Sequence, residues 1–535
     1  MLLTSLFIII IYSSIHNRTN HFNKDMSRIG ILIILYSLYI LIDSNIETLI
    51  GINSIPIYNN IYKVNLLSQS ISILILSLSI ILLFNSISGI INIKDIDMIN
   101  YNIKNYIVIL LFNIIGLLLF LNVNDLIALY ITIELQSYSL YIMTSIYNKS
   151  NNALKAGLLY FLIGGIASIF ILYGTSIIYY ITGSLNLDHI YILTNYNNNI
   201  YIGFIMILMG FILKMGMAPL HNWSINIYNN TPTIITAWIS LVSKLSIMTL
   251  LFIIIYNINT YNNTNNILTY TISLFVILSL IIGSIGGLMQ IKIKVLLTYS
   301  GILNGGYLLY TVLINSIDSI VAYIIYVLQY SLTHINIFII ILLLPSILYN
   351  NNIIMNSTNT NNSTNTNSNT NSNTTSGGPS GANNIDQLYT SIFSPIEYIN
   401  QFKLLISINP FINLALIISL FSLIGIPPLF GFYGKWLIII SALSNGYIYM
   451  TILLIICSTI STLYYIYVIK ESSIYDNLHN SIDTKYQYVY NNYINGNSVS
   501  YMISVLTLIT LLNGVQIINI IKGAFIIGIS VINII

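Results

Sequence analysis

Apolar runs of about 18 to 30 residues recur along nearly the whole chain, separated by short polar segments. An apolar helix needs about 20 residues to cross a bilayer. The pattern therefore predicts an all-α, polytopic integral membrane protein with about fourteen transmembrane helices. The expected spans are 1–15, 28–43, 66–92, 104–122, 124–146, 153–182, 200–229, 233–256, 266–288, 293–315, 318–349, 403–443, 447–469 and 499–535.

Composition also indicates that lipid is the solvent for most of the chain. Of its 535 residues, 56% are hydrophobic and only 6% are charged, whereas soluble proteins are about 25% charged. The net charge of +3 is too small to indicate a nucleic-acid partner. Cys457 is the only cysteine, which excludes a disulfide framework and a cysteine-ligated cluster held by this chain alone. Because no phosphate-binding loop or metal-ligand spacing is present, we expect this chain to bind no cofactor and no metal.

Most basic residues fall on one side of the predicted threading, as the positive-inside rule requires. Lys63 and Lys522 fall on the other side, together with both termini. The abundance of isoleucine, asparagine and tyrosine indicates an AT-rich organellar genome, and we interpret the apolar N-terminus as a first membrane helix rather than a transit peptide. The basic loops hold Arg18, Lys24, Arg28, Lys94, Lys104, Lys149, Lys155, Lys292, Lys294, Lys403, Lys470 and Lys485.

Residues 350–384 differ from the rest in composition, since they are nearly all Asn, Ser and Thr and end in a Gly- and Pro-containing stretch. Such a segment cannot bury apolar surface. We predict a disordered insertion.

Two long apolar runs contain proline at corresponding places. Residues 216–223, with Pro219, resemble residues 425–429, with Pro427 and Pro428. Proline removes a helix hydrogen bond and clashes with the preceding turn. Two interrupted helices at matching positions indicate a transport site.

One acidic and three basic residues lie deep in predicted helices: Glu134, Lys214, Lys244 and Lys435. A charge at the bilayer centre costs about 2.5–3.5 kcal/mol on insertion scales, so each needs a reason. The alternatives to a functional role are a structural ion pair for Glu134 and snorkelling for the lysines. Asp125 lies at a helix start, where a role as helix cap is the better interpretation.

Glu134 and Lys214 are predicted to lie within ion-pair reach. Burial disfavours the charged form of a lysine, whereas a nearby carboxylate favours it. A Glu–Lys pair whose separation changes can therefore switch a lysine between holding and donating a proton. Several such groups near mid-membrane, connected by water, would form a proton relay.

Two histidines are secondary candidates for this relay. His221 lies at the first helix interruption, where it would either extend the relay or satisfy freed backbone carbonyls. His334 follows Tyr326 and Tyr330 at four-residue steps, so one helix face carries all three. That face is either a polar seam between helices or the lining of a channel.

Four segments resemble motifs of the antiporter-like membrane subunits of respiratory complex I, and in particular of its chain 2 (bacterial subunit N). They follow the order and spacing of that family over about residues 100–470. Lys435 favours chain 2, since chain 4 relatives usually have Glu there and chain 5 relatives are longer. The segments are Asn124–Leu140, Leu213–Thr236, Gln290–Tyr307 and Gly425–Lys435.

The resemblance implies two inverted five-helix repeats with broken helices 7 and 12, and a proton path along the four deep charges. It also implies that Lys155 and Lys294 are secondary candidates for the relay, although spacing alone indicates that Lys155 is a loop charge. The domains expected are residues 1–103 (helices 1–3), 104–256 (first repeat), 257–349 and 385–470 (second repeat), 350–384 (the insertion) and 471–535 (a loop and helix 14).

The sequence departs from the family at several positions. Asn229 and Asn230 replace an acidic residue and a glycine, and Asn336 stands where relatives favour a small residue. Asn304 stands where relatives have a histidine. Because asparagine cannot titrate, a relay through that helix would need water or Lys294.

The resemblance implies a proton-translocating membrane-arm subunit of complex I, coupling NADH:ubiquinone oxidoreduction to proton pumping in the mitochondrial inner membrane. FMN, iron–sulfur clusters and ubiquinone are then expected in other subunits, and neighbouring antiporter-like subunits and lipids are the expected partners. Two alternatives share these motifs: a free-standing cation/proton antiporter and a purely structural membrane-arm subunit. Co-purification with flavin and iron–sulfur subunits would distinguish a complex I subunit from a free-standing antiporter. Proton-pumping measurements on lysine variants would distinguish a proton-translocating subunit from a purely structural one.

Overall fold

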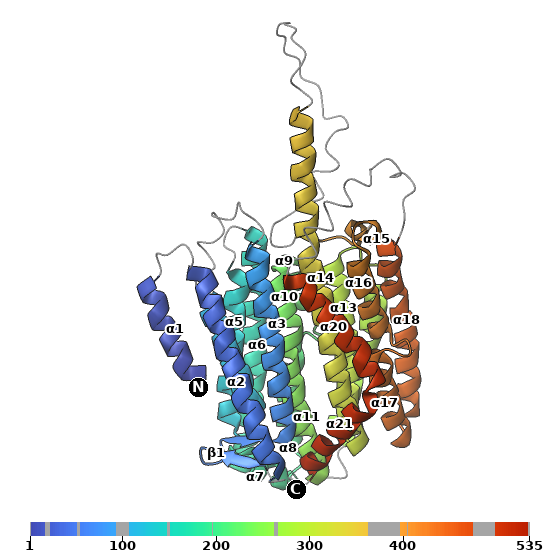
Figure 1. Ribbon diagram of the computed structural model, residues 1–535. Coiled ribbons are helices and arrows are strands. Elements are labelled where there is room, and N and C mark those ends of the chain that lie inside the picture. The colour runs from blue at the N-terminus through green and yellow to red at the C-terminus, as the bar shows by residue number, and fades with distance from the viewer. Residues whose placement is uncertain are drawn as a thin grey trace, which may run out of the picture.

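The computed structural model describes residues 2–16, 22–50, 54–91, 106–146, 150–194, 196–261, 266–361, 396–403, 405–473 and 498–532. Nearly all of them are helical, and the long helices run side by side in one bundle (Figure 1). A small hairpin and α7 lie at one end of the bundle, which we call the hairpin side. The far end of α14 projects from the opposite end, which we call the insertion side (Figure 1).

Fourteen elements lie among the described residues before residue 262. These are α1 (Leu2–His16), α2 (Phe22–Ile50), β1 (Ile55–Ile57), β2 (Tyr62–Val64), α3 (Leu66–Ile91), α4 (Tyr106–Leu121), α5 (Leu126–Ser145), α6 (Asn151–Thr182), α7 (Leu187–Leu193), α8 (Ile200–Met215), α9 (Asn222–Asn230), α10 (Thr233–Trp238), the π-helix η3 (Ile239–Ser243) and α11 (Lys244–Tyr261).

After residue 265, every element among the described residues is a helix. These helices are α12 (Asn266–Gly287), α13 (Ile293–Ile314), α14 (Ile317–Asn361), the 3₁₀ helix η5 (Ile399–Phe402), α15 (Leu405–Ile408), α16 (Pro410–Ile424), α17 (Phe430–Ser444), α18 (Ile448–Ser473), α20 (Ser498–Val515) and α21 (Ile517–Ile532).

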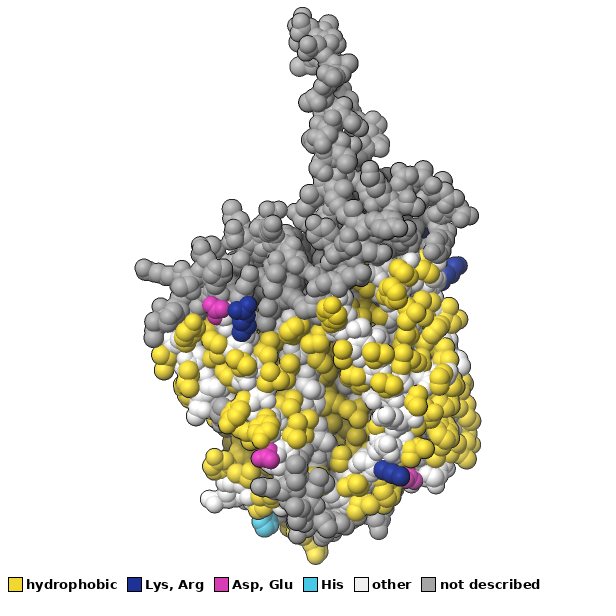
Figure 2. Space-filling model, in the orientation of Figure 1, with side chains coloured by type: hydrophobic (Ala, Val, Ile, Leu, Met, Phe, Trp, Pro, Cys, Tyr) yellow, Lys and Arg dark blue, Asp and Glu magenta, His cyan; other side chains and the backbone are white. Residues whose placement is uncertain are grey.

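Membrane-spanning length is common among these helices. Among the described residues, eight helices are long and apolar enough to cross a membrane, or nine if the bent pair α20–α21 is one span, and five shorter helices are also apolar. Hydrophobic side chains cover most of the described surface in Figure 2, with few charged ones between them. The all-α, polytopic class is confirmed, whereas the number of about fourteen spans stays a prediction.

Three predicted helices have wrong boundaries. The second helix covers Phe22–Ile50 rather than 28–43, and α14 continues to Asn361 rather than ending near residue 349. Once a helix is nucleated in the bilayer, adding polar residues to its end costs little. Residues 362–384 of the expected insertion lie outside the described part of the chain. The run expected at 403–443 begins its helix at Pro410, because Asn409 caps the backbone N–H groups of Phe411 and Ile412.

The single C-terminal helix expected over 499–535 is instead two helices, α20 and α21, bent by 82°. The end of α20 passes close to the backbone between α16 and α17. A Cβ on Gly514 would lie 2.4 Å from the carbonyl oxygen of Pro428, so only glycine permits this approach. Beyond the bend, α21 runs across the bundle and packs against α14 (Figure 1).

On the hairpin side, β1 pairs antiparallel with β2, and Pro56 lies opposite Lys63. The carboxylate of Asp188 accepts hydrogen bonds from Lys63 Nζ at 3.1 Å, Asn60 Nδ2 at 3.2 Å and Asn124 Nδ2 at 2.9 Å. Burial raises the pKa of Asp188, but the Lys63 ammonium and these hydrogen bonds outweigh it and hold the pKa below its usual value. This network fastens the hairpin to the loops before α5 and α7.

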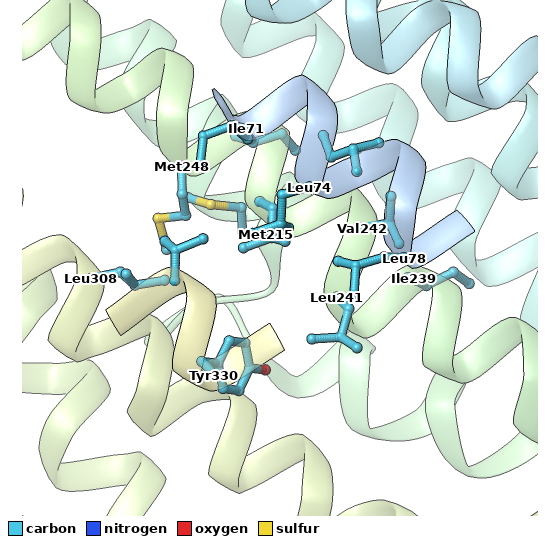
Figure 3. Packing of buried hydrophobic residues seen from close by; sticks show 14 of the residues in the cluster. Ile71, Leu74, Leu78, Met215, Ile239, Leu241, Val242, Met248, Leu308 and Tyr330 are labelled. Carbon is cyan, nitrogen blue, oxygen red and sulfur yellow. The ribbon is translucent and has the colours of Figure 1, made fainter. Parts of the chain in front are cut away.

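The interior of the bundle is one continuous apolar core. Figure 3 shows side chains from α3, α8, α11 and α13 in contact within it, among them Ile71, Met215, Met248 and Leu308. Polar groups inside this core are costly unless they are hydrogen-bonded, which makes the buried charges described next conspicuous.

Candidate functional site

Glu134 is held inside the bundle by α5. Asp125 precedes that helix, and its carboxylate accepts hydrogen bonds from the backbone N–H groups of Ile127 and Ala128, which confirms its interpretation as a helix cap. Glu134 lies further along α5 and only 11% of its side chain is exposed. The cap therefore explains Asp125 but leaves Glu134 without a role in helix formation.

Lys214 pairs with Glu134. Its Nζ lies 2.8 Å from Glu134 Oε1 and donates a second hydrogen bond to Ser137 at 3.3 Å. Lys214 occupies the last turn of α8, where the helix dipole also favours a positive charge. The predicted proximity of Glu134 and Lys214 is thus confirmed.

α8 stops directly after this lysine. Gly216 adopts a left-handed conformation with φ 66°, and α9 begins at Asn222. Between them, His221 Nδ1 lies 3.1 Å from the carbonyl oxygen of Pro219. Of its two predicted roles, this contact favours satisfying the freed backbone.

Lys244 opens α11 directly after the π-helix η3. Its side chain is buried, and Nζ lies 5.6 Å from the centre of the Tyr228 ring, within cation–π range. A Cβ on Gly301 would lie 3.7 Å from Lys244 Nζ and 3.4 Å from the Tyr330 hydroxyl. Lys244 therefore lies where α11 meets α13 and α14, well inside the bundle rather than snorkelling to its edge.

Lys435 lies one turn beyond the second helix interruption. α16 ends at Gly425, which has φ 90°, and α17 begins at Phe430. Lys435 Nζ donates a hydrogen bond of 2.9 Å to the carbonyl oxygen of Ile424 and lies 5.5 Å from the centre of the Tyr307 ring. This lysine is also buried, and it uses a carbonyl freed by the interruption.

A row of buried polar groups between α13 and α14 extends from the Lys244 side to the Lys435 side. The Tyr326 hydroxyl donates to Asn304 Oδ1 at 2.8 Å, and the rings of Tyr326 and Tyr307 contact edge to face. Among the described residues, neither the Tyr330 hydroxyl nor the ring nitrogens of His334 make a hydrogen bond of good geometry. Buried groups of this kind are commonly satisfied by internal water.

The other two lysine candidates lie apart from this row. Lys294 is buried near the insertion side and donates to the carbonyl oxygen of Thr231 at 2.7 Å. Lys155 is exposed on α6, so its role stays a prediction. In the described part of the chain, no three His, Cys, Asp or Glu side chains come together as a metal site would need.

Sequence reasoning missed two features of the site. The rings of Tyr228 and Tyr307 face Lys244 and Lys435, and the chain contains too many tyrosines for composition to single these two out. The second missed feature is the π-helix before Lys244. Such turns frequently occur at functional sites, but no sequence pattern indicates this one.

Comparison with known proteins places these residues in a family. The family described as NADH:quinone oxidoreductase/Mrp antiporter, TM matches residues 123–367 and 388–461. NADH-ubiquinone oxidoreductase chain 2 of Wickerhamomyces canadensis is 40% identical over 500 residues, covering 84% of this chain and 82% of that protein. The Rhizopus oryzae protein of the same name is 32% identical over 458 residues, covering 83% and 80%.

Solved structures share the fold at low identity. A chain of respiratory complex I from Thermus thermophilus matches with a TM-score of 0.68 and 19% identity, covering 98% of this chain and 99% of that one. A chain of the Mrp complex from Dietzia sp. matches with a TM-score of 0.73 and 16% identity, covering 100% and 95%.

Proposed function

Because the chain belongs to the NADH-ubiquinone oxidoreductase chain 2 family of antiporter-like membrane subunits, we propose that it translocates protons in the membrane arm of complex I. Relatives of this name are subunits of an oxidoreductase complex, NADH-ubiquinone oxidoreductase. The role proposed for this chain is to couple that redox reaction to proton pumping through Glu134, Lys214, Lys244 and Lys435.

One observation carries the proposal: a buried Glu134–Lys214 ion pair is continued inside the same bundle by two further buried lysines. A purely structural bundle would gain little from these charges, since well-packed apolar residues are often as stable as a buried ion pair. Lys244 and Lys435 are held by ring faces and a backbone carbonyl, none of which bears a full negative charge. A positive charge at these two positions can therefore be removed without stranding a carboxylate.

The geometry suggests how protons move between these groups. When Lys214 separates from Glu134, the ammonium loses its counter-charge and can pass a proton on. The Tyr330 hydroxyl and the side chains of Asn304 and Tyr326 offer donors and acceptors between Lys244 and Lys435. In this scheme Asn304, which cannot titrate, orients the Tyr326 hydroxyl and any water beside it.

The proposal also covers the orientation of the chain in the membrane and its partners. The described basic residues outside the deep set lie mostly at the insertion side, on elements such as the start of α13 and the end of α18. We therefore assign the insertion side to the matrix and the hairpin side to the intermembrane space of a mitochondrial inner membrane. The proposed partners are neighbouring antiporter-like subunits. Residues 104–256 form the first proposed inverted repeat, with Lys155 on an exposed face, and residues 257–349 and 385–470 form the second.

A free-standing cation/proton antiporter is the second candidate, and similarity of the fold to the Mrp complex chain supports keeping it. Co-purification decides between the two. A complex I subunit should be recovered with flavin and iron–sulfur subunits after mild detergent extraction, whereas a free-standing antiporter should be recovered without them.

Substitution of Lys244 tests the relay itself. Arginine retains the charge but does not release its proton at accessible pH. We expect Lys244→Arg to assemble, while NADH oxidation and proton pumping fall by about tenfold or more because one transfer step is blocked.

Lys244→Met provides the comparison, because it removes the charge and keeps an apolar stem. A relay predicts that both variants pump poorly. Rescue by Lys244→Arg of a defect caused by Lys244→Met would instead show a structural role.

A further inference from the structure

Glu397 is a partly buried carboxylate held against the start of α13 on the insertion side. The backbone N–H of Ile293 donates to the carbonyl oxygen of Glu397 at 2.9 Å, and the N–H of Ile399 donates to that of Ile291 at 3.0 Å. These two bonds hold a short extended segment antiparallel to the chain entering α13. Backbone bonds therefore fix Glu397 in place, which leaves its side chain available for another task.

The bond to Ile293 places the backbone of Glu397 beside the residue that precedes Lys294, although within the described residues the two side chains form no ion pair. Only 3% of Lys294 is exposed, and its Nζ donates to the carbonyl oxygen of Thr231. Glu397 attracts the Lys294 ammonium, whereas Lys292 repels it. A lysine so enclosed cannot exchange protons directly with bulk water, whereas the carboxylate of Glu397 is partly exposed.

The face of α13 that carries Lys294 runs from the insertion side toward the middle of the bundle. Leu297 and Gly301 follow at helical spacing on that face. His334 of α14 lies beside the backbone of Leu297, and Lys244 Nζ lies beside Gly301. The α13 face that carries Lys294, Leu297 and Gly301 thus extends from the insertion side of the bundle to Lys244.

We propose that Glu397 is the carboxylate through which protons from the aqueous phase on the insertion side enter the relay, a role that rests on the proposed function. A proton from water binds a carboxylate oxygen of Glu397. Once the Lys294 ammonium has given its own proton inward, the proton on Glu397 passes to the resulting amine through an intervening water, and Glu397 returns to its ionised form. His334 and Lys244 are the next acceptors.

The competing explanation is that Glu397 only supplies a counter-charge for Lys294. Glu397→Gln distinguishes the two, since glutamine keeps the shape and hydrogen-bonding capacity but cannot carry the proton. The variant is measured within the complete complex, in inverted membrane vesicles whose outer face is the side that oxidises NADH. All rates are divided by the amount of assembled complex, so that reduced assembly does not hide the result.

We expect NADH oxidation and proton pumping by Glu397→Gln to fall by about tenfold. Added formate should restore a large part of the rate, because a small diffusible acid can deliver protons to Lys294 where the carboxylate is missing. The matched control is Asp318→Asn, which removes an exposed carboxylate from the opposite end of the bundle, at the start of α14. It should show neither the loss nor the effect of formate.

A normal rate per assembled Glu397→Gln complex overturns the proposal, and so does a slow rate that formate leaves unchanged. The Lys244→Arg variant separates this failure from failure of the relay. If Lys244→Arg stalls while Glu397→Gln pumps normally, the relay stands and protons enter elsewhere. If both pump normally, the relay itself is wrong.

Discussion

The two interrupted helices have similar backbones but hold their lysines differently. α8 and α16 both end at a left-handed glycine, Gly216 and Gly425, and in each a proline follows shortly afterwards. Lys214 precedes its interruption, whereas Lys435 follows the other one. The two lysines therefore approach the site from opposite sides of their respective breaks.

Their partners differ more than their positions. Lys214 has the full negative charge of Glu134 at 2.8 Å, whereas Lys435 has a backbone carbonyl and a ring face. The first interruption thus holds a pair with no net charge, and the second holds a single positive charge stabilised by dipoles. A helix interrupted at a left-handed glycine therefore accommodates two electrostatic arrangements, so loss of the lysine should have different consequences at the two interruptions.

The largest effect is expected from Lys214→Met, which leaves Glu134 buried without its partner. Breaking a buried pair in this way costs about 3–5 kcal/mol, so the amount of assembled complex on native gels should fall sharply. The double variant Glu134→Gln/Lys214→Met contains no stranded charge and should recover assembly while remaining unable to pump. Equal assembly of the single and double variants would contradict the pairing.

Lys435→Met should have a smaller effect on stability, because it strands only the carbonyl oxygen of Ile424. Such a loss costs about 1–3 kcal/mol, and the complex should still assemble. Proton pumping should nevertheless fall by about tenfold, measured as acidification by reconstituted vesicles. Trp436→Phe changes the next residue, which is partly exposed; it is the control and should pump normally. If Lys435→Met reduced assembly as strongly as Lys214→Met, the distinction between the two sites would be removed.

The smallest effect is expected from deleting residues 356–375, which lie before the second interrupted helix and have no counterpart before the first. The segment is almost entirely Asn, Ser and Thr, so its removal should change stability by less than about 0.5 kcal/mol and leave NADH oxidation unchanged. Yield and turnover of the purified complex test this. A complex that no longer assembles would assign the segment a docking role.

The sequence alone determined the class of the protein and much of the site. Long apolar runs with few charges require lipid as solvent, and a charge inside such a run requires a partner or a function. Glu134 and Lys214 could therefore be predicted to meet, and proline and glycine marked both interruptions. Asn409 and Pro410 carried the signal for the start of α16, although the apolar run around them concealed it.

Only the tertiary structure decided what surrounds these charges. The ring over Lys435 comes from α13, far earlier in the chain, and Glu397 lies beside the start of α13 because its segment pairs with the chain entering that helix. The π-helix before Lys244 and the bend after α20 depend on how neighbouring helices pack. Hydrophobic periodicity reports how a helix divides between core and lipid, but it cannot report which helix lies opposite, because any apolar face fits lipid and protein alike.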